Sequence, residues 1–184
     1  MSKARFGVWV VLLSVVTGAA GAEEELGTIA ELEIWWHQRL AEARSEDGAM
    51  LAAFTTDGCS GGMSSVWRAI AQTFPDFRDT QGETPPWESC CVEHDVAYHI
   101  GGADVSPKAG YFARLSADET LRQCVQEVAQ SEGAALQLLY GQSQETIETA
   151  FEFISNRMFD AVRVGGAPCS GLPWRWGYGW PQCW

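Results

Sequence analysis

The chain has few basic residues. Lys and Arg together number 12 against 24 Asp and Glu, which gives a formal net charge of −12 at pH 7 over 184 residues. Because recognition of a phosphate backbone requires clustered Lys and Arg side chains, this composition argues against nucleic-acid binding. We expect no nucleic-acid partner.

Long apolar runs are also scarce. Beyond the N-terminal region, no segment of the sequence approaches the ~20 apolar residues that a membrane-spanning helix needs. The sequence also lacks internal repeats, low-complexity tracts and a convincing series of strands. Its length favours one domain. We therefore predict a mainly α-helical single domain over residues 23–184.

The N-terminal apolar run has the features of an export signal. Lys3 and Arg5 precede an almost wholly apolar stretch at 6–16, and small residues at 20–22 provide a cleavage site. The alternative, a membrane anchor, would need a longer apolar run. We expect residues 1–22 to be a signal peptide and the mature protein to be secreted or periplasmic.

Export favours disulfides over free thiols. The six cysteines allow 15 pairings, at positions 59, 90, 91, 124, 169 and 183. Cys90 and Cys91 would point about 100° apart on a helix, so they are expected to bond to different partners. Adjacent cysteines also lack the usual separation of zinc ligands, which disfavours a zinc site with His94.

Periodicity and boundary residues predict the helices. A Pro-Pro step precedes one helix and Gly101–Gly102 follows it, while Ser106–Pro107 begins the next. The region 54–65 and the Trp- and Gly-rich C-terminal tail from residue 169 are expected to be loops. The expected helices are 29–43, a short one at 66–74, 87–100, 106–131 and 143–162.

Apolar stripes predict which face of a helix is buried. In the first helix the stripe consists of Ile29, Leu32, Trp36 and Leu40. In the last helix it consists of Ile147, Phe151, Ile154, Met158 and Val162. His37 and His99 lie outside any such pattern, and we expect them at the surface.

Two cysteines accompany a His-Asp pair on the helix at 87–100. At 100° per residue, five side chains fall within an arc of about 140°. They are Cys90, Cys91, His94, Asp95 and Tyr98. Disulfides from this face would hold the His-Asp pair rigidly against neighbouring segments.

An acidic residue interrupts the apolar stripe of the helix at 106–131. Asp118 lies among Tyr111, Leu115, Leu121 and Val125. Because an unpaired buried carboxylate costs several kcal/mol, this position predicts a hydrogen-bond donor opposite Asp118. His94 is the best candidate, and the alternative is a structural carboxylate bonded to a tyrosine, Tyr98 or Tyr111.

The segment Cys90–Tyr98 resembles a known signature. Its pattern, Cys-Cys-x-x-His-Asp-x-x-Tyr, is similar to that of the secreted, calcium-dependent phospholipase A2 superfamily. The resemblance spans roughly residues 54–125. The chain departs from the family in the long segment 63–88, for which the sequence predicts no role.

The resemblance implies a calcium-binding loop before the helix that carries the signature. Gly58-Cys59-Ser60-Gly61-Gly62 is similar to that loop. The implied Ca²⁺ ligands are the carboxylate of Asp95 and the backbone carbonyls of Gly58, Ser60 and Gly62. Asp57 is a further candidate that could replace one carbonyl. Calcium prefers six to eight oxygen ligands, which glycine-rich loops can supply.

The resemblance also implies a fold, a disulfide pattern and a reaction. The fold is a pair of disulfide-linked antiparallel helices with a calcium loop, and the disulfides are Cys59–Cys91, Cys90–Cys124 and Cys169–Cys183. The implied catalytic residues are His94, Asp118 and Tyr98. His94 would activate a water for attack on the sn-2 ester of a glycerophospholipid, and Asp118 would orient the imidazole.

The expected partner is a phospholipid membrane surface or micelle. Because the chain is acidic, zwitterionic lipid is favoured over anionic lipid. The tryptophans could contribute to such a surface or pack internally, and packing is favoured for Trp67 and Trp87. The alternatives are a non-catalytic secreted relative that binds a lipid or receptor, and a structural module with an incidental calcium site.

Overall fold

The computed structural model describes residues 27–59, 63–103 and 106–184. This part of the chain contains helices and no strands, which confirms the mainly α-helical prediction. No described helix is long and apolar enough to cross a membrane. The predicted signal peptide, residues 1–22, lies outside the described residues. The helices are α1 (Thr28–Ser45), α2 (Met63–Thr73), α3 (Pro75–Gln81), α4 (Glu88–Ile100), α5 (Pro107–Ser131), α6 (Gly133–Tyr140) and α7 (Gln144–Gly165).

Helices α4 and α5 form an antiparallel pair. α4 ends at Ile100 and is followed by Gly101, which adopts a left-handed conformation with φ of 71°, and α5 begins at Pro107. Three contacting pairs show the antiparallel direction, because the residue numbers increase along α4 while they decrease along α5. The pairs are Cys90 with Cys124, His94 with Asp118 and Tyr98 with Arg114. The predicted helix boundaries are therefore confirmed to within a residue or two.

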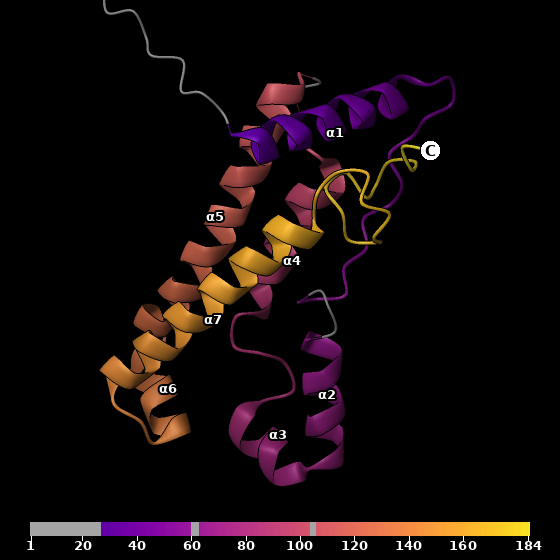
Figure 1. Ribbon diagram of the computed structural model, residues 1–184. Helices are drawn as coiled ribbons and strands as arrows, with labels where there is room; N and C mark the ends of the chain where they lie inside the picture. Colours follow the sequence, from indigo (N-terminus) through magenta and orange to yellow (C-terminus); the bar gives the residue numbers. More distant parts are fainter. Residues whose placement is uncertain (1–26, 60–62, 104–105) are drawn as a thin grey trace, which may run out of the picture.

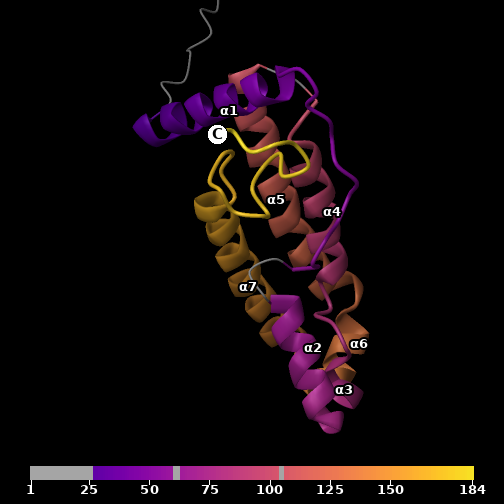
Figure 2. The same cartoon turned by 90° about the vertical axis from the view of Figure 1, so that its right-hand side faces the viewer.

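Helix α5 is central to the arrangement. It packs against α1, α4 and α7, and α1 lies across one end of these helices (Figures 1 and 2). Helices α2 and α3, which come from the long segment 63–88, lie at the opposite end with α6. The site residues on α4 and α5 thus lie between α1 on one side and α2 on the other.

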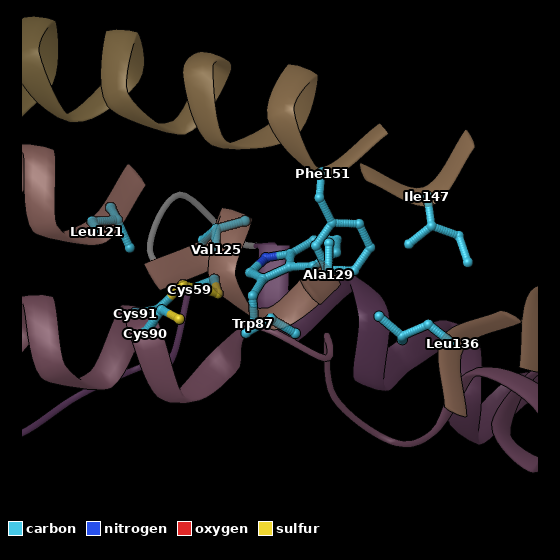
Figure 3. Packing of buried hydrophobic residues seen from close by; sticks show 11 residues of the cluster. Cys59, Trp87, Cys90, Cys91, Leu121, Val125, Ala129, Leu136, Ile147 and Phe151 are labelled. Carbon is cyan, nitrogen blue, oxygen red and sulfur yellow. A yellow bond between two sulfur atoms is a disulfide. The ribbon is translucent and has the colours of Figure 1, made fainter. Parts of the chain in front are cut away.

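A hydrophobic core joins α4, α5 and α7 near the α2 end. Trp87, at 6% exposure, packs edge-to-face against Phe151, with ring centroids 5.2 Å apart. Val125 and Leu121 of α5 lie between these helices in the same cluster (Figure 3). Burial of such aromatic and aliphatic area is the main favourable term in folding.

Three disulfides link the described residues, and none of the cysteines is free. The pairs are Cys59–Cys91, Cys90–Cys124 and Cys169–Cys183, so the implied pairing is confirmed. The neighbours Cys90 and Cys91 bond in different directions, one to α5 and the other to the segment before α2. This arrangement restricts rotation of α4 about its own axis. Three disulfides are compatible with a protein in an oxidising compartment.

The C-terminal loop covers the end of α4. The backbone amides of Gly177 and Gly179 donate to the carbonyls of Tyr98 and His99, at 2.6 and 3.1 Å. The indole of Trp180 donates to the carbonyl of Ile100 at 2.9 Å. Helix ends leave their last carbonyls without partners inside the helix, and this loop supplies the partners.

The buried face of α1 differs from the prediction. Ile29 and Leu32 are 85% and 55% exposed, whereas Glu33 and His37 are buried beside Leu40. The reason is that α1 packs on the charged part of α5, where Arg114 supplies a partner for Glu33. The predicted stripe was therefore wrong at its first two positions.

Other sequence-based predictions also need correction. His37 and His99 are 4% and 5% exposed, not surface residues. Two short helices, α3 and α6, were not predicted; α3 begins with a proline at a position where a helix tolerates it. Trp87 is buried, as expected. The exposed tail residue Trp184 packs edge-on against Trp36 of α1, with ring centroids 5.3 Å apart.

Candidate functional site

A His-Asp pair joins α4 and α5. His94 Nε2 lies 2.8 Å from Asp118 Oδ1, and both side chains are buried. The hydroxyl of Tyr98 donates to the same oxygen at 2.7 Å. The Tyr98 ring packs against the imidazole with centroids 4.1 Å apart. The donor predicted opposite Asp118 is thus His94, with Tyr98 as a second donor.

The other oxygen of Asp118 faces two arginines. Arg163 of α7 donates from Nη1 to Oδ2 at 2.8 Å, and Arg114 Nε lies 3.9 Å from the same oxygen. Burial acts to raise the pKa of Asp118, but the hydrogen bond from His94, the charge of Arg114 and the hydrogen bonds from Arg163 and Tyr98 together lower it below the usual value. Asp118 is therefore held as a carboxylate.

A second carboxylate, Glu33 of α1, completes a buried charge network. Its Oε1 pairs with Arg114 Nη1 and its Oε2 with Arg163 Nη2, each at 2.6 Å. His37 Nε2 lies 3.5 Å from Glu33 Oε1. The negative charges of Asp118 and Glu33 are thus balanced by the positive charges of Arg114 and Arg163.

Sequence reasoning missed Glu33, Arg114 and Arg163. One signal was present: Arg114 precedes Asp118 by four residues, a spacing that places both on the same face of a helix. No comparable local pattern connects Asp118 to Arg163 or to Glu33, which lie on other helices.

The buried charge network should contribute to the stability of the fold. Replacement of Arg114 by Leu leaves Glu33 with one cation in place of two and is expected to lower the free energy of unfolding by about 3–5 kcal/mol. At about 2–4 °C per kcal/mol, the melting temperature should fall by roughly 6–20 °C. Thermal unfolding followed by circular dichroism measures this.

The matched control is Arg39→Leu on α1. Arg39 pairs with Glu42 at the surface, where its side chain is 40% exposed, and exposed pairs contribute about 0–1 kcal/mol. Equal melting temperatures for the two variants would contradict the importance of the buried network.

Asp95 lies next to the loop before α2. Its Oδ2 accepts a hydrogen bond from Thr56 Oγ1 at 2.6 Å, and that hydroxyl accepts from the amide of Gly58 at 3.0 Å. The Cys59–Cys91 disulfide ties the same loop to α4. Burial raises the pKa of Asp95 to about 6, and the charge of Asp57 acts in the same direction.

Gly58 occupies a position that other residues would fit poorly. Its φ of 78° is in the left-handed region, and a Cβ there would lie 2.6 Å from Ser64 Oγ. The Ser64 hydroxyl accepts from the amide of Cys59 at 2.8 Å. The glycine therefore allows the chain to turn closely beside Ser64.

The groups around Asp95 indicate whether a cation could bind there. The charge of the exposed Asp57 raises the pKa of the buried Asp95, and a buried carboxylate beside a like charge is stabilised when a cation is near. In the part of the chain that the structure describes, no three His, Cys, Asp or Glu side chains are grouped to hold a metal ion. A cation here would therefore rely on backbone carbonyls as well. Ser60 and Gly62, two of the expected ligands, lie outside the described residues.

A cavity of about 270 Å³ adjoins both His94 and Asp95. Most of its remaining lining is apolar and comes from α2, α5 and α7. Three residues of the apolar stripe predicted for 143–162 contribute to it, and they are half-buried because they face this space: Ile154, Met158 and Val162. The cavity could hold an apolar chain beside the imidazole.

The structure thus brings together most of the residues singled out from the sequence. His94, Tyr98 and Asp118 form one hydrogen-bonded group, and Asp95 adjoins the same cavity as His94. Gly58 lies in the loop that contacts Asp95 through Thr56. No protein-family model, curated protein or solved structure matches the chain.

Proposed function

We propose that the protein is a calcium-dependent hydrolase similar to the secreted phospholipases A2, acting on the sn-2 acyl ester of glycerophospholipids. The observation that carries the proposal is the buried His94–Asp118 pair, 2.8 Å apart, at the wall of an apolar cavity that Asp95 also lines. A paired base, a carboxylate near a loop and an apolar cavity are the parts that such a reaction needs.

The chemistry of this chain's residues follows from the hydrogen bonds. With Nε2–H donated to Asp118, His94 has Nδ1 as its basic nitrogen. Nδ1 would take a proton from a water as the water oxygen attacks the ester carbonyl carbon. The imidazolium would then give that proton to the departing glycerol oxygen, releasing a fatty acid and a lysophospholipid. Asp118 would stabilise the imidazolium throughout.

A calcium ion suits the donors around Asp95. The Asp95 carboxylate would hold it together with the carbonyl of Gly58 and, as further candidates, Ser60, Gly62 and Asp57. When bound, Ca²⁺ supplies positive charge that can bind a phosphate and polarise an ester carbonyl. The support is the pairing of a buried carboxylate with a like-charged neighbour at a glycine-containing loop.

The direct test uses the purified mature chain with phosphatidylcholine vesicles in CaCl₂. Release of the sn-2 fatty acid, identified by mass spectrometry on lipids with two different chains, is the expected result. Anionic phosphatidylglycerol vesicles should be hydrolysed more slowly, because the chain is acidic. Calcium and vesicle binding without any fatty-acid release would instead support a non-catalytic lipid-binding protein.

The raised pKa of Asp95 makes calcium affinity depend on pH. A proton on Asp95 competes with Ca²⁺, so the affinity should be nearly constant above pH 7 and fall by up to tenfold per pH unit below about 6. A carboxyl group with an ordinary pKa would keep full affinity down to about pH 5. Isothermal titration calorimetry between pH 4.5 and 7.5 measures the dependence.

The control for this titration is Asp95→Asn, which should bind Ca²⁺ weakly and without that pH dependence. If the affinity of the unmodified protein does not change between pH 5 and 7, Asp95 is not the ligand that titrates.

A further inference from the structure

The Asp118 carboxylate divides its two oxygens between different partners. Oδ1 accepts from Tyr98 and contacts His94, at 2.7 and 2.8 Å. Oδ2 accepts from Arg163 at 2.8 Å. Arg163 comes from the last turns of α7, so a third helix determines how this carboxylate is oriented.

Arg163 is itself held at several points. Its Nη2 pairs with Glu33 Oε2 at 2.6 Å, and its guanidinium carbon lies 5.6 Å from the centre of the Tyr111 ring. The Arg163 side chain is only 16% exposed. A planar guanidinium between two carboxylates has little freedom to rotate, because its donors are fixed in one plane.

This arrangement restrains the carboxylate. The terminal torsion of an aspartate is broad and lets either oxygen turn toward a neighbour. With Arg163 bonded to Oδ2, rotation of Asp118 would break an ion pair that is buried from water. Oδ1 consequently stays directed at the imidazole of His94.

We propose that Arg163 is a positioning residue for the His94–Asp118 pair, and that Glu33 of α1 fixes the orientation of Arg163. Arg163 does not line the cavity beside His94, so it acts through Asp118 and not on a substrate. The inference rests on the proposed function for its kinetic consequence, but its structural consequence does not depend on any activity.

The first test is Arg163→Met. We expect kcat for phospholipid hydrolysis to fall about 10–100-fold, the usual effect of losing a partner that orients a functional group. KM should change less than threefold, since the cavity is unaltered. Arg163→Lys should recover only part of kcat, because an ammonium group lacks the planar set of donors with which the guanidinium bonds to Asp118 and Glu33 at the same time.

A second variant separates positioning from charge balance. Glu33→Gln combined with Arg163→Met removes one charge of each sign and should recover much of any melting temperature lost in Arg163→Met. Positioning requires that its kcat stay low; recovery of kcat in the double variant would overturn the proposal. Arg78→Met, at an exposed pair with Asp79, is the matched control and should keep full activity.

A readout without substrate completes the test. In calcium-free protein, ¹H–¹⁵N spectra of the histidine side chains should show His94 as one tautomer with a protonated Nε2, and Arg163→Met should give averaged tautomers. Unchanged spectra and unchanged kcat in the variant would refute the role of Arg163. If the parent chain hydrolyses no phospholipid but the spectra change as stated, the positioning role stands and the proposed function fails.

Discussion

The His94→Gln variant is expected to lose phospholipid hydrolysis by a factor of at least 10²–10⁴, the contribution of a general base. Glutamine can keep a hydrogen bond to Asp118 but cannot take a proton from water. Because His94 contacts Asp118 in a network with other donors, the variant should retain its helical circular dichroism spectrum. Initial rates of fatty-acid release measure the loss.

His99→Gln provides the control. His99 lies on the same helix and is buried to a similar extent, but its ring packs against Phe54 and Tyr178. Its substitution should leave most of the activity. Hydrolysis that persists in His94→Gln, or that falls equally in both variants, would exclude His94 as the base.

Removal of calcium should have an effect of comparable size. With EDTA in excess, fatty-acid release is expected to fall below detection and to return when CaCl₂ is added back. Asp95→Asn should act like EDTA at low calcium, because asparagine can still accept the hydrogen bond from Thr56 but carries no charge. The measurement is the rate as a function of free calcium.

Glu93→Gln is the matched control for Asp95→Asn. It removes a carboxylate two positions away, on the exposed side of α4, and should leave the calcium dependence unchanged. Turnover that is insensitive to EDTA would contradict the proposed role of calcium even if His94 is essential.

The helical hairpin that carries the pair could be predicted closely from the sequence. Local signals determine it: a Pro-Pro step and two glycines limit α4, and Ser106–Pro107 begins α5. The conflict between a carboxylate and an apolar stripe was also local, and it correctly indicated a donor opposite Asp118. The boundaries of α4 and α5 and the buried face of α5 depend on residues close together in the sequence, so the sequence pattern predicts them.

The charge network could not be predicted in the same way. Glu33 and Arg163 are 130 residues apart, and each in isolation looks like a solvated charge on a helix. Their partners are defined only when α1 and α7 pack on α5. The same dependence explains the error on α1, where Ile29 was expected in the core and Glu33 occupies it.

The C-terminal loop over the end of α4 has a consequence for the order of folding. The amides of Gly177 and Gly179 complete carbonyls that belong to the helix carrying His94. A ribosome delivers residues 177–180 about eighty positions after that helix. The last carbonyls of α4 can therefore obtain these partners only after the C-terminal loop has been synthesised, so completion of this helix end depends on the final part of the chain.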